Sequence, residues 1–346
     1  MGVSTNGAMT AQRSASSQVS MKAIVCRTPG RPDALRLEEI DKPVIAEDGV
    51  LVRVHATSIN PVDFFPLTPV GFMTRRSSVR SKPKVVLIGT DFAGIVEAVG
   101  RKVTQFKVGD EVFGGRPGAF AEYVSMPESG PVVRKPANLT FEQAAAAPVA
   151  AVTALQAVRD HGRVKPGQRV LINGASGGVG SFALQIAKLF GAEVTAVCSP
   201  RNLERARSLG ADRVIDYTKE DYTRSAERYD VLLDIAGSHS WSESTRVLQP
   251  QGTFVLAGAS AYTVFGGNRA IMHILRFRLS SLLSSRRFAF FIAKLSKEDL
   301  TALGELLSSG KLTAAIDRQY ELSQVAQAMN YMGEGHAKGK IVVRVA

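Results

Sequence analysis

The pattern of apolar and polar positions changes once along the chain, near residue 139. From residue 21 to about residue 133, short β-type runs such as MKAIVC and VLVRVHATSI alternate with the turn signals PG, DG and KP. GTDFAGIVEAVG, VGDEVFGG and GAFAEYVSM are glycine-punctuated runs of the same kind. This half of the chain predicts a compact, β-barrel-like domain with little helix.

Helical periodicity begins after residue 139. The stretch NLTFEQAAAAPVAAVTALQAVRDHG predicts a long helical region that Thr140 opens, with Gln143 at the spacing of a capping box. Strand-like and helix-like segments then alternate, from RVLING and VGSFALQIAKLFG through EVTAVCS and NLERARSLG to TFVLAGAS. Short connections between such segments indicate a parallel sheet with helices on both faces. A helix near residues 298–309 follows, and we expect the last strand, KIVVRVA, to rejoin the first domain.

The composition is that of a globular protein with two cores. The chain has 346 residues, of which 45% are hydrophobic and 21% charged, and this length is enough for two domains. No run reaches the roughly 18 apolar residues that a membrane span needs, and we interpret the Ala-rich run 144–155 as a buried helix. Residues 1–20 have no acidic side chain and no apolar core of a secretory signal, so we expect a disordered tail.

Cysteine and histidine usage indicates a reducing compartment and no metal site. Cys26 and Cys198 are far apart in sequence and suggest no disulfide framework. The five histidines form no HxH or HExxH pattern and no Cys/His pair at metal-ligand spacing. We therefore expect a cytoplasmic protein without a bound metal, and organelle targeting by the tail stays open. The formal net charge of +12 favours anionic partners, which leaves nucleic acid, a membrane surface and a phosphorylated cofactor open.

The stretch RVLINGASGGVGSFALQIAK carries a glycine-rich turn with the spacing G-x-x-G-x-x-G. Glycines let the backbone bend tightly and approach a pyrophosphate, and the helix that follows presents unpaired N–H groups and a partial positive charge to it. A purely structural turn is the alternative, but this turn follows a predicted strand and opens a predicted helix, as dinucleotide binding requires. The predicted cofactor turn consists of Gly174, Ala175, Ser176, Gly177, Gly178, Val179 and Gly180.

The residues after the second strand of this unit favour NADPH over NADH. An NAD site usually carries Asp or Glu about 20 residues beyond the glycines, whereas this chain reads SPRN at residues 199–202. Ser199 can donate to a 2′-phosphate, and Arg201 supplies charge and a planar donor fork. We include Asn202 in the same site, and Tyr217 after the third strand could flank the adenine or donate to the phosphate. The alternative is that Arg201 is an ordinary surface arginine.

These residues resemble a known family. GQRVLINGASGGVGSFALQIAK is similar to the signature of the quinone oxidoreductase/zeta-crystallin branch of the medium-chain dehydrogenase/reductases, and NPVD, GTDFAGIVEAVG, GDEVFG, GAFAEYV and HAKGKIVVRV also occur in register. The resemblance covers nearly all of residues 21–346. It implies an α/β fold in which a GroES-like, β-rich catalytic domain at 21–146, joined again by 290–346, holds an inserted Rossmann domain at 147–289. The Rossmann domain is a doubly wound parallel sheet, and homodimers through it are common in the family.

The same resemblance implies chemistry without zinc. Zinc-dependent relatives carry a cysteine where this chain has SIN at 58–60, and Gly-His-Glu where it has GTD at 89–91. Losing that Lewis acid disfavours simple alcohol oxidation. A site without zinc suits substrates that accept hydride and delocalise the resulting negative charge, such as quinones or α,β-unsaturated carbonyls. The enolate formed from an enone then needs only preorganised hydrogen-bond donors.

Several residues are implied to lie beside the nicotinamide and the substrate. Asn60 of NPVD matches a position near the nicotinamide and the substrate oxygen, and its alternative role is to brace the turn that follows it. Thr153 matches the position whose hydroxyl approaches the nicotinamide ribose, and its alternative is a bond to its own helix backbone. Gly258 and Ala259 after the last Rossmann strand, and Ala236 after the strand before it, are expected on the cofactor side.

The loop after NPVD departs from part of the family. Several enoyl reductases in this branch place a proton-donating tyrosine there, but residues 63–82 contain none, so solvent protonation or quinone reduction gains weight. Phe64 and Phe65 suggest an apolar substrate pocket, and core packing is equally open for them. We expect Asp63, the third member of this predicted pocket, to orient the loop rather than to transfer protons.

A basic, apolar segment, NRAIMHILRFRLSSLLSSRRFAFFIAK, follows the Rossmann pattern. The residues that fit one helical face are Ile271, Ile274, Leu275, Leu279, Leu282 and Leu283, although Met272 and Phe277 interrupt a clean stripe. Three roles stay open: a helix packed between the domains, a lid over the substrate, and an interfacial membrane helix.

The predicted function is NADPH-dependent, metal-free reduction of a quinone or of the C=C of an α,β-unsaturated carbonyl. A carbonyl reductase is one alternative. Another is a non-catalytic NADPH-binding protein that attaches to RNA or to a membrane surface. The sequence has no RNA-binding signature and no aromatic–basic interleaving on predicted strands, so nucleic acid is disfavoured.

Overall fold

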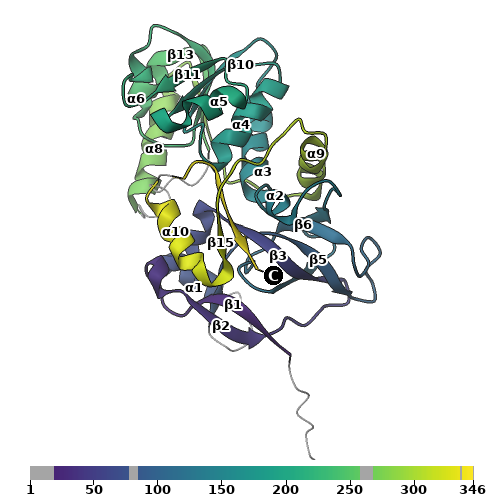
Figure 1. Cartoon of the computed structure of the whole chain (residues 1–346). Coiled ribbons are helices and arrows are strands. Elements are labelled where there is room, and N and C mark those ends of the chain that lie inside the picture. The colour runs from purple at the N-terminus through teal and green to yellow at the C-terminus, as the bar shows by residue number, and fades with distance from the viewer. Residues whose placement is uncertain (1–18, 78–84, 258–267, 336, 346) are drawn as a thin grey trace, which may run out of the picture.

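The computed structural model describes residues 19–77, 85–257, 268–335 and 337–345 of the chain (Figure 1). The strands of these residues form three sheets. A six-stranded sheet lies in the upper half of Figure 1, and two β-rich sheets lie below it. The yellow C-terminal part of the chain runs back into the lower half, so that half is built from both the early and the late residues.

The lower half consists of a three-stranded sheet, β2–β1–β4, and a seven-stranded sheet, β15–β16–β3–β5–β6–β8, with β7 paired to β3. Their bounds are β1 Ser20–Cys26, β2 Arg36–Asp41, β3 Gly49–Ile59, β4 Val86–Leu87, β5 Asp91–Val99, β6 Glu111–Gly115, β7 Tyr123–Pro127, β8 Val132–Arg134, β15 Ile316–Glu321 and β16 Lys340–Arg344. The helices of this half are η1 Pro32–Ala34, η2 Pro61–Leu67, α1 Pro69–Ser77, η7 Leu322–Gln324 and α10 Val325–Gly333. Helix α9, Lys297–Ser308, contacts both β8 of this half and α3 of the other. The predicted tail lies outside the described residues up to residue 18.

The upper half is an all-parallel sheet in the order β11–β10–β9–β12–β13–β14. Its strands are β9 Arg169–Asn173, β10 Glu193–Cys198, β11 Arg213–Asp216, β12 Tyr229–Asp234, β13 Leu248–Leu256 and β14 Arg287–Phe290. The helices around it are α3 Pro148–Gln156, η3 Ala157–Gly162, α4 Gly178–Leu189, η4 Pro200–Asn202, α5 Leu203–Ser208, η5 Tyr222–Arg224, α6 Trp241–Ser244, η6 Thr245–Val247 and α8 Asn268–Leu282. This is the strand order of a doubly wound Rossmann sheet, and the predicted α/β fold class is confirmed.

Alternate residues of the Rossmann strands face two different cores. Val170 and Ile172 of β9 belong to the core shared with α3, α4 and α9, whereas Leu171 between them faces the core shared with α6 and α8. Such alternation, with both sides apolar, is what a strand covered by helices on both faces requires.

The last strand joins the early part of the chain, as the sequence pattern predicted. β16 pairs antiparallel with β3, with Ile341 opposite Ile59, and β15 pairs parallel with β16 on its other side. The pairing brings Lys340, at the head of β16, to the end of β3 and to the loop that follows it.

The long helical region predicted at residues 138–162 is interrupted. The capping box forms: the Gln143 N–H donates to Thr140 Oγ1 at 3.2 Å, and the Thr140 N–H donates to Gln143 Oε1 at 2.9 Å. This box opens only the short helix α2, Phe141–Ala145. A new helix, α3, begins at Pro148, since proline has no N–H to donate to a preceding turn and is suited to a first helical position.

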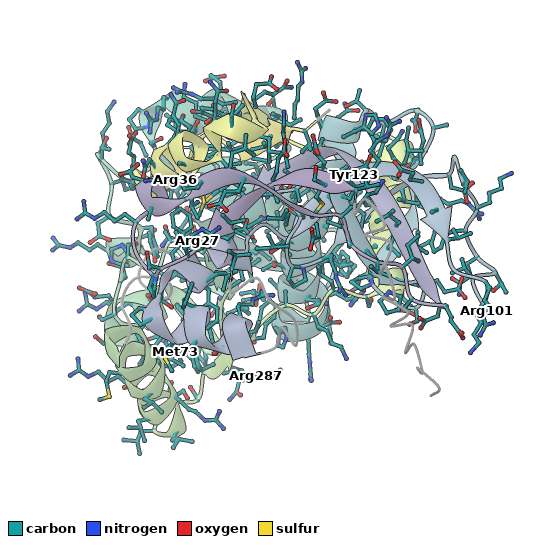
Figure 2. All side chains as sticks on the ribbon, turned by 90° about the horizontal axis from the view of Figure 1, so that it is seen from below. Arg27, Arg36, Met73, Arg101, Tyr123 and Arg287 are labelled. Atoms are coloured by element: carbon teal, nitrogen blue, oxygen red, sulfur yellow. The ribbon has the colours of Figure 1, made fainter. Side chains whose placement is uncertain are left out.

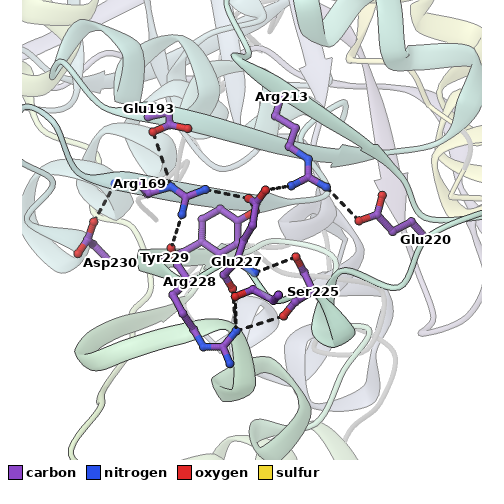
Figure 3. Close-up of polar contacts among 10 residues, drawn as sticks. Arg169, Glu193, Arg213, Glu220, Ser225, Glu227, Arg228, Tyr229 and Asp230 are labelled. Atoms are coloured by element: carbon purple, nitrogen blue, oxygen red, sulfur yellow. Dashed lines mark hydrogen bonds and ion pairs between the residues drawn. The ribbon is translucent and has the colours of Figure 1, made fainter.

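Charged side chains join the amino-terminal ends of the Rossmann strands (Figure 3). Arg169 at the start of β9 donates its N–H to Asp230 Oδ2 at 2.8 Å, and its guanidinium pairs with Glu227 at 2.8 Å. Arg213 at the start of β11 pairs with the other oxygen of Glu227 and with Glu220. In open α/β sheets, ligands bind at the carboxyl ends of the strands. This network lies at the opposite edge of the sheet.

Helix α8 packs on the sheet by a face that the sequence pattern did not indicate. Phe277 is 3% exposed, and its ring centroid lies 5.4 Å from that of Phe254 and 6.0 Å from that of Trp241. The apolar face predicted from the spacing is not the packed one: Leu275, Leu279, Leu282 and Leu283 are 45%, 63%, 75% and 96% exposed, whereas Ile274 packs partly against the core. The segment is apolar on two sides, and contact with the aromatic rings of α6 and β13 selects the side that holds Phe277. Ile271 lies outside the described side chains.

We predict that Phe277→Ala destabilises the protein by about 3–5 kcal/mol, since it leaves a cavity among aromatic rings. Leu279→Ala, on the exposed side of the same helix, should change the free energy of unfolding by less than about 0.5 kcal/mol. Urea unfolding followed by tryptophan fluorescence measures both. Equal effects of the two substitutions would contradict the assignment of the buried face.

Candidate functional site

The glycine-rich turn lies where β9 ends and α4 begins. Gly174 has φ 87°, a left-handed conformation that glycine adopts without steric cost. The N–H groups of Gly174 and Ala175 donate to Val197 O of β10 at 3.2 and 3.1 Å, and the Gly177 N–H donates to Gly174 O at 3.2 Å. Helix α4 starts at Gly178. Since the first N–H groups of an α-helix have no partner within the helix, the turn presents donors at the carboxyl edge of the sheet.

The three glycines of the motif differ in what a side chain would meet. A Cβ on Gly180 would lie 2.1 Å from Gly174 O, a distance that the backbone cannot accommodate. A Cβ on Gly177 would have only Gly174 O within 4 Å, at 3.6 Å. Packing therefore requires Gly180, and the left-handed φ requires Gly174. Gly177 instead borders open space next to the helix N-terminus, which fits a pyrophosphate.

The residues predicted for the 2′-phosphate lie at the carboxyl ends of β10 and β11. Ser199 follows β10, and its hydroxyl accepts from Asn202 Nδ2 at 3.0 Å. Asn202 is 3% exposed, and its Oδ1 has no hydrogen-bond partner among the described residues. Arg201 is exposed, and so is Tyr217, whose N–H donates to Cys198 O of β10 at 3.3 Å. The hydroxyl and guanidinium donors after β10 fit a phosphate group.

The remaining predicted cofactor residues follow the central strands. The Ala236 nitrogen, after β12, lies 3.2 Å from the position of a Cβ on Gly174, so Ala236 borders the glycine-rich turn. Gly258 and Ala259, predicted after β13, lie outside the described residues.

A buried ionic cluster lies where β3, β5, β16 and α3 meet. Asp91, the first residue of β5, is 0% exposed. Its Oδ2 accepts from Ser58 Oγ at 2.6 Å and from Asn60 Nδ2 at 2.8 Å, and its Oδ1 accepts from the Val149 N–H at 2.9 Å, in the first turn of α3. Lys340 is 2% exposed; its Nζ lies 3.5 Å from Asp91 Oδ2 and donates to Asn60 Oδ1. We call these five residues the Asp91 cluster.

Lys340 connects the Asp91 cluster to the glycine-rich turn. Its Cδ lies 2.9 Å from the position of a Cβ on Gly178, so the lysine stem passes next to the first residue of α4. Burial lowers the pKa of Lys340 because its ammonium loses hydration, and the carboxylate of Asp91 acts in the opposite direction. Lys340 was not among the predicted site residues. The signal that could have found it is a lysine at the head of the apolar strand KIVVRV.

Both residues predicted to contact the nicotinamide make hydrogen bonds within the protein. The side-chain nitrogen and oxygen of Asn60 both make hydrogen bonds within the Asp91 cluster. The backbone N–H of Asn60 donates to Asp63 Oδ2 at 2.8 Å, which matches the alternative role of bracing the turn. Thr153 donates its hydroxyl to Val149 O at 2.7 Å, the helix-backbone bond that was its alternative. Their contact with a cofactor stays a prediction.

Asp63 is a buried carboxyl group in η2. Besides the Asn60 N–H, it accepts a hydrogen bond from Thr90 Oγ1 at 2.8 Å. Burial raises the pKa of Asp63 to about 7; the hydrogen bond from Thr90 opposes this rise, and the neighbouring charge of Asp91 adds to it. Two hydrogen bonds across the loop fit the loop-orienting role expected from the sequence.

Phe64 and Phe65 point to different surroundings. Phe64 is 2% exposed and packs in the core formed with Ile24 of β1 and Met329 of α10, which accounts for it without a substrate. Phe65 is 39% exposed, so it is the one of the two that a substrate can reach.

The described part of the chain contains neither a cluster suited to a metal ion nor a helix suited to span a membrane. Its His, Cys, Asp and Glu side chains form no group of three or more that could hold a metal ion. Its helices include none that is both long and apolar enough to cross a membrane.

We predict that Asp63 makes stability depend on pH. The carboxyl group titrates near pH 7 in the folded protein and near about 3.9 when unfolded. Its contribution to stability is therefore complete below about pH 4 and is lost as the pH rises to about 7, by at most about 1.4 kcal/mol per pH unit. Asp63→Asn keeps an acceptor for Asn60 and removes the titration.

The measurement is urea unfolding at several pH values between about 4 and 8. The wild-type protein should lose stability with rising pH more steeply than Asp63→Asn. Asp48→Asn, at an exposed carboxyl group, is the matched control and should keep the wild-type slope. Identical slopes for the wild type and Asp63→Asn would contradict the raised pKa.

Comparison with known proteins agrees with this geometry. A family model described as "Alcohol dehydrogenase GroES-like domain" matches residues 46–137, and one described as "Zinc-binding dehydrogenase" matches residues 209–343. A mouse protein named "NAD(P)H oxidoreductase RTN4IP1, mitochondrial" is 35% identical over 94% of this chain and 89% of its own length. An Arabidopsis thaliana protein named "NADPH-dependent alkenal/one oxidoreductase, chloroplastic" is 34% identical over 98% of this chain and 83% of its own length.

Solved structures share the whole arrangement of both halves. The quinone oxidoreductase from Coxiella burnetii superposes with a TM-score of 0.82 and 32% sequence identity, over 95% of this chain and 100% of that one. The resemblance inferred from the sequence motifs is thereby confirmed. The chain belongs to the quinone oxidoreductase branch of the medium-chain dehydrogenase/reductase superfamily.

Proposed function

We propose that the protein is an NADPH-dependent oxidoreductase that transfers hydride to a quinone or to the C=C of an α,β-unsaturated carbonyl compound. The observation that carries the proposal is the open space at Gly177 of the glycine-rich turn. Lys340 of the Asp91 cluster lies next to Gly178, the following residue, so the open space and the cluster are close together. An anion-binding turn and a buried set of polar donors thus lie next to each other. The names of the relatives, an NADPH-dependent alkenal/one oxidoreductase and a quinone oxidoreductase, support the same reaction class.

The residues of the glycine-rich turn and of the β10 edge would hold the cofactor. The N–H groups at the start of α4 bind the pyrophosphate. Ser199 and Arg201 contact the 2′-phosphate that distinguishes NADPH from NADH, and Tyr217 flanks the adenine. NADPH supplies the hydride from C4 of its nicotinamide ring.

The Asp91 cluster would stabilise the negative charge that forms on the substrate oxygen. Asn60 Nδ2 and Lys340 Nζ are donors held in place by oxygen acceptors of the protein, and a substrate oxygen would replace one of these acceptors. Lys340 also provides a positive charge in a site shielded from water, where electrostatic interactions are strong. With no tyrosine in residues 63–82, we assign protonation of the α-carbon of an enone to solvent.

The assembly and the cellular location stay predictions. A homodimer through the Rossmann sheet would use β14, the last strand of that sheet, and light scattering of the purified protein checks it. The predicted location is cytoplasmic, whereas the names of the mouse and Arabidopsis relatives place those two proteins in mitochondria and chloroplasts.

The test of the proposal is turnover by the purified full-length protein. We expect it to oxidise NADPH, and NADH at least about tenfold less efficiently because NADH lacks the phosphate, with 1,4-quinones or enones as acceptors. With NADPH deuterated at C4, the label should appear on the β-carbon of a reduced enone. Turnover of saturated aldehydes alone would favour a carbonyl reductase, and failure to bind NADPH would refute the proposal.

Substitutions at two glycines separate cofactor binding from folding. We predict that Gly177→Ala keeps the fold, because its Cβ has open space, and weakens NADPH binding at least about tenfold by occupying the place of the pyrophosphate. Gly180→Ala should instead destabilise the protein, because its Cβ would meet Gly174 O at 2.1 Å. Fluorescence titration and thermal unfolding measure the two effects. Unchanged NADPH affinity of Gly177→Ala would contradict the assigned phosphate position.

A further inference from the structure

The side of α8 that faces away from the Rossmann sheet is an apolar stripe without a partner among the described residues. Its members and their exposed fractions are Met272 50%, Leu275 45%, Leu279 63%, Leu282 75% and, directly after the helix, Leu283 96%. At 3.6 residues per turn these positions fall within a sector of about 100°. The packed side of α8 holds Phe277, so the fold does not need the stripe for its core.

Arginines border this stripe on both of its sides. Arg276 and Arg278 are exposed and lie on opposite sides of the leucines around the helix axis. Between Glu243 and Glu298 the sequence contains no Asp or Glu. The basic residues of that interval are Arg246, Arg269, Arg276, Arg278, Arg286, Arg287, Lys294 and Lys297. Leucines flanked by long cationic side chains are typical of helices that lie in a membrane interface, because the cations reach the head groups while the leucines enter the acyl region.

A second helix extends the same side of the molecule. α1 exposes Val70 by 69% and Met73 by 70%. Figure 2 labels Met73 on the side of the molecule on which α8 is seen. Between Asp63 and Asp91 the sequence again has no acidic residue. Two helices far apart in sequence, α1 and α8, therefore expose apolar side chains in parts of the chain that lack carboxylates.

We propose that the stripe of α8, with its flanking arginines, docks the protein on membranes that contain anionic lipids. We call these residues, Met272 to Leu283 on the exposed side, the α8 surface. Anionic head groups complement a surface whose neighbouring sequence is free of carboxylates, and the leucines supply the apolar contact that charge alone does not. This docking goes beyond the proposed reaction and does not depend on it.

A second copy of the chain is a poorer occupant of the α8 surface. A two-fold contact places the same patch of both copies face to face. Arg276 and Arg278 of one copy would then lie near those of the other, with no carboxylate from the surrounding segment to separate the charges. A bilayer brings no such repulsion, and its negative surface potential attracts each arginine.

The test is co-sedimentation of the full-length protein with lipid vesicles. We expect binding to vesicles of phosphatidylcholine mixed with phosphatidylglycerol, and at least about tenfold weaker binding to phosphatidylcholine alone. Binding should weaken as salt is added, because salt screens the charges. The double substitution Leu279→Glu and Leu282→Glu should weaken binding to the anionic vesicles at least about tenfold, since it places carboxylates on the stripe.

Leu189→Glu is the control, because Leu189 is 44% exposed on α4 and the substitution adds a carboxylate outside the α8 surface. It should bind the anionic vesicles as the wild type does, and thermal unfolding verifies that all variants are folded. Absence of wild-type binding to the anionic vesicles would overturn the proposal. Equal binding by the double variant would also overturn it. If light scattering shows that the double substitution only dissociates a dimer, the α8 surface is a contact between copies instead.

Discussion

One buried carboxylate holds the parts of this protein in their mutual positions. Asp91 accepts hydrogen bonds from Ser58 and Asn60 at the end of β3, and from Val149 at the start of α3, and it pairs with Lys340 at the head of β16. Removing an ion pair from water costs several kcal/mol per ion, and only a complete set of hydrogen bonds offsets this cost. Since these partners belong to three different segments, none of the segments can shift without leaving a buried charge unsatisfied.

The position of the phosphate-binding turn depends on the same carboxylate. Lys340 is fixed by Asp91 and Asn60, and its stem contacts the position where Gly178 begins α4. Helix α3, whose first turn donates to Asp91, packs directly against α4. The half of the molecule that would hold a substrate and the half that would hold a dinucleotide are thus aligned by side chains and not only by the backbone crossing between them. Preorganisation of this kind is what hydride transfer between two bound molecules requires.

A structural feature could be predicted from the sequence when the residues that determine it are close together along the chain. The turn at Gly174, the capping box at Thr140 and the last strand are specified by a few neighbouring residues, and all three are found in the structure. The ion pair of Asp91 and Lys340 joins residues 249 positions apart, and neither residue carries a local motif that names its partner. The packed face of α8 could not be predicted for another reason. Both sides of this helix are apolar, and only the aromatic rings of other elements distinguish Phe277 from the leucines.

The separation of Asp91 from Lys340 also has a consequence for the biosynthesis of the protein. At a synthesis rate of about 5–20 residues per second, a gap of 249 residues means that Asp91 leaves the peptidyl-transferase centre roughly 12–50 seconds before its counter-charge. During that time every strand of the Rossmann sheet is made, whereas the strand that carries Lys340 does not yet exist. An unpaired carboxylate is costly to bury, and until the strand that carries Lys340 is made Asp91 has no counter-charge from that strand. The seven-stranded sheet, which includes β15 and β16, can therefore be completed only after all six strands of the Rossmann sheet have been synthesised.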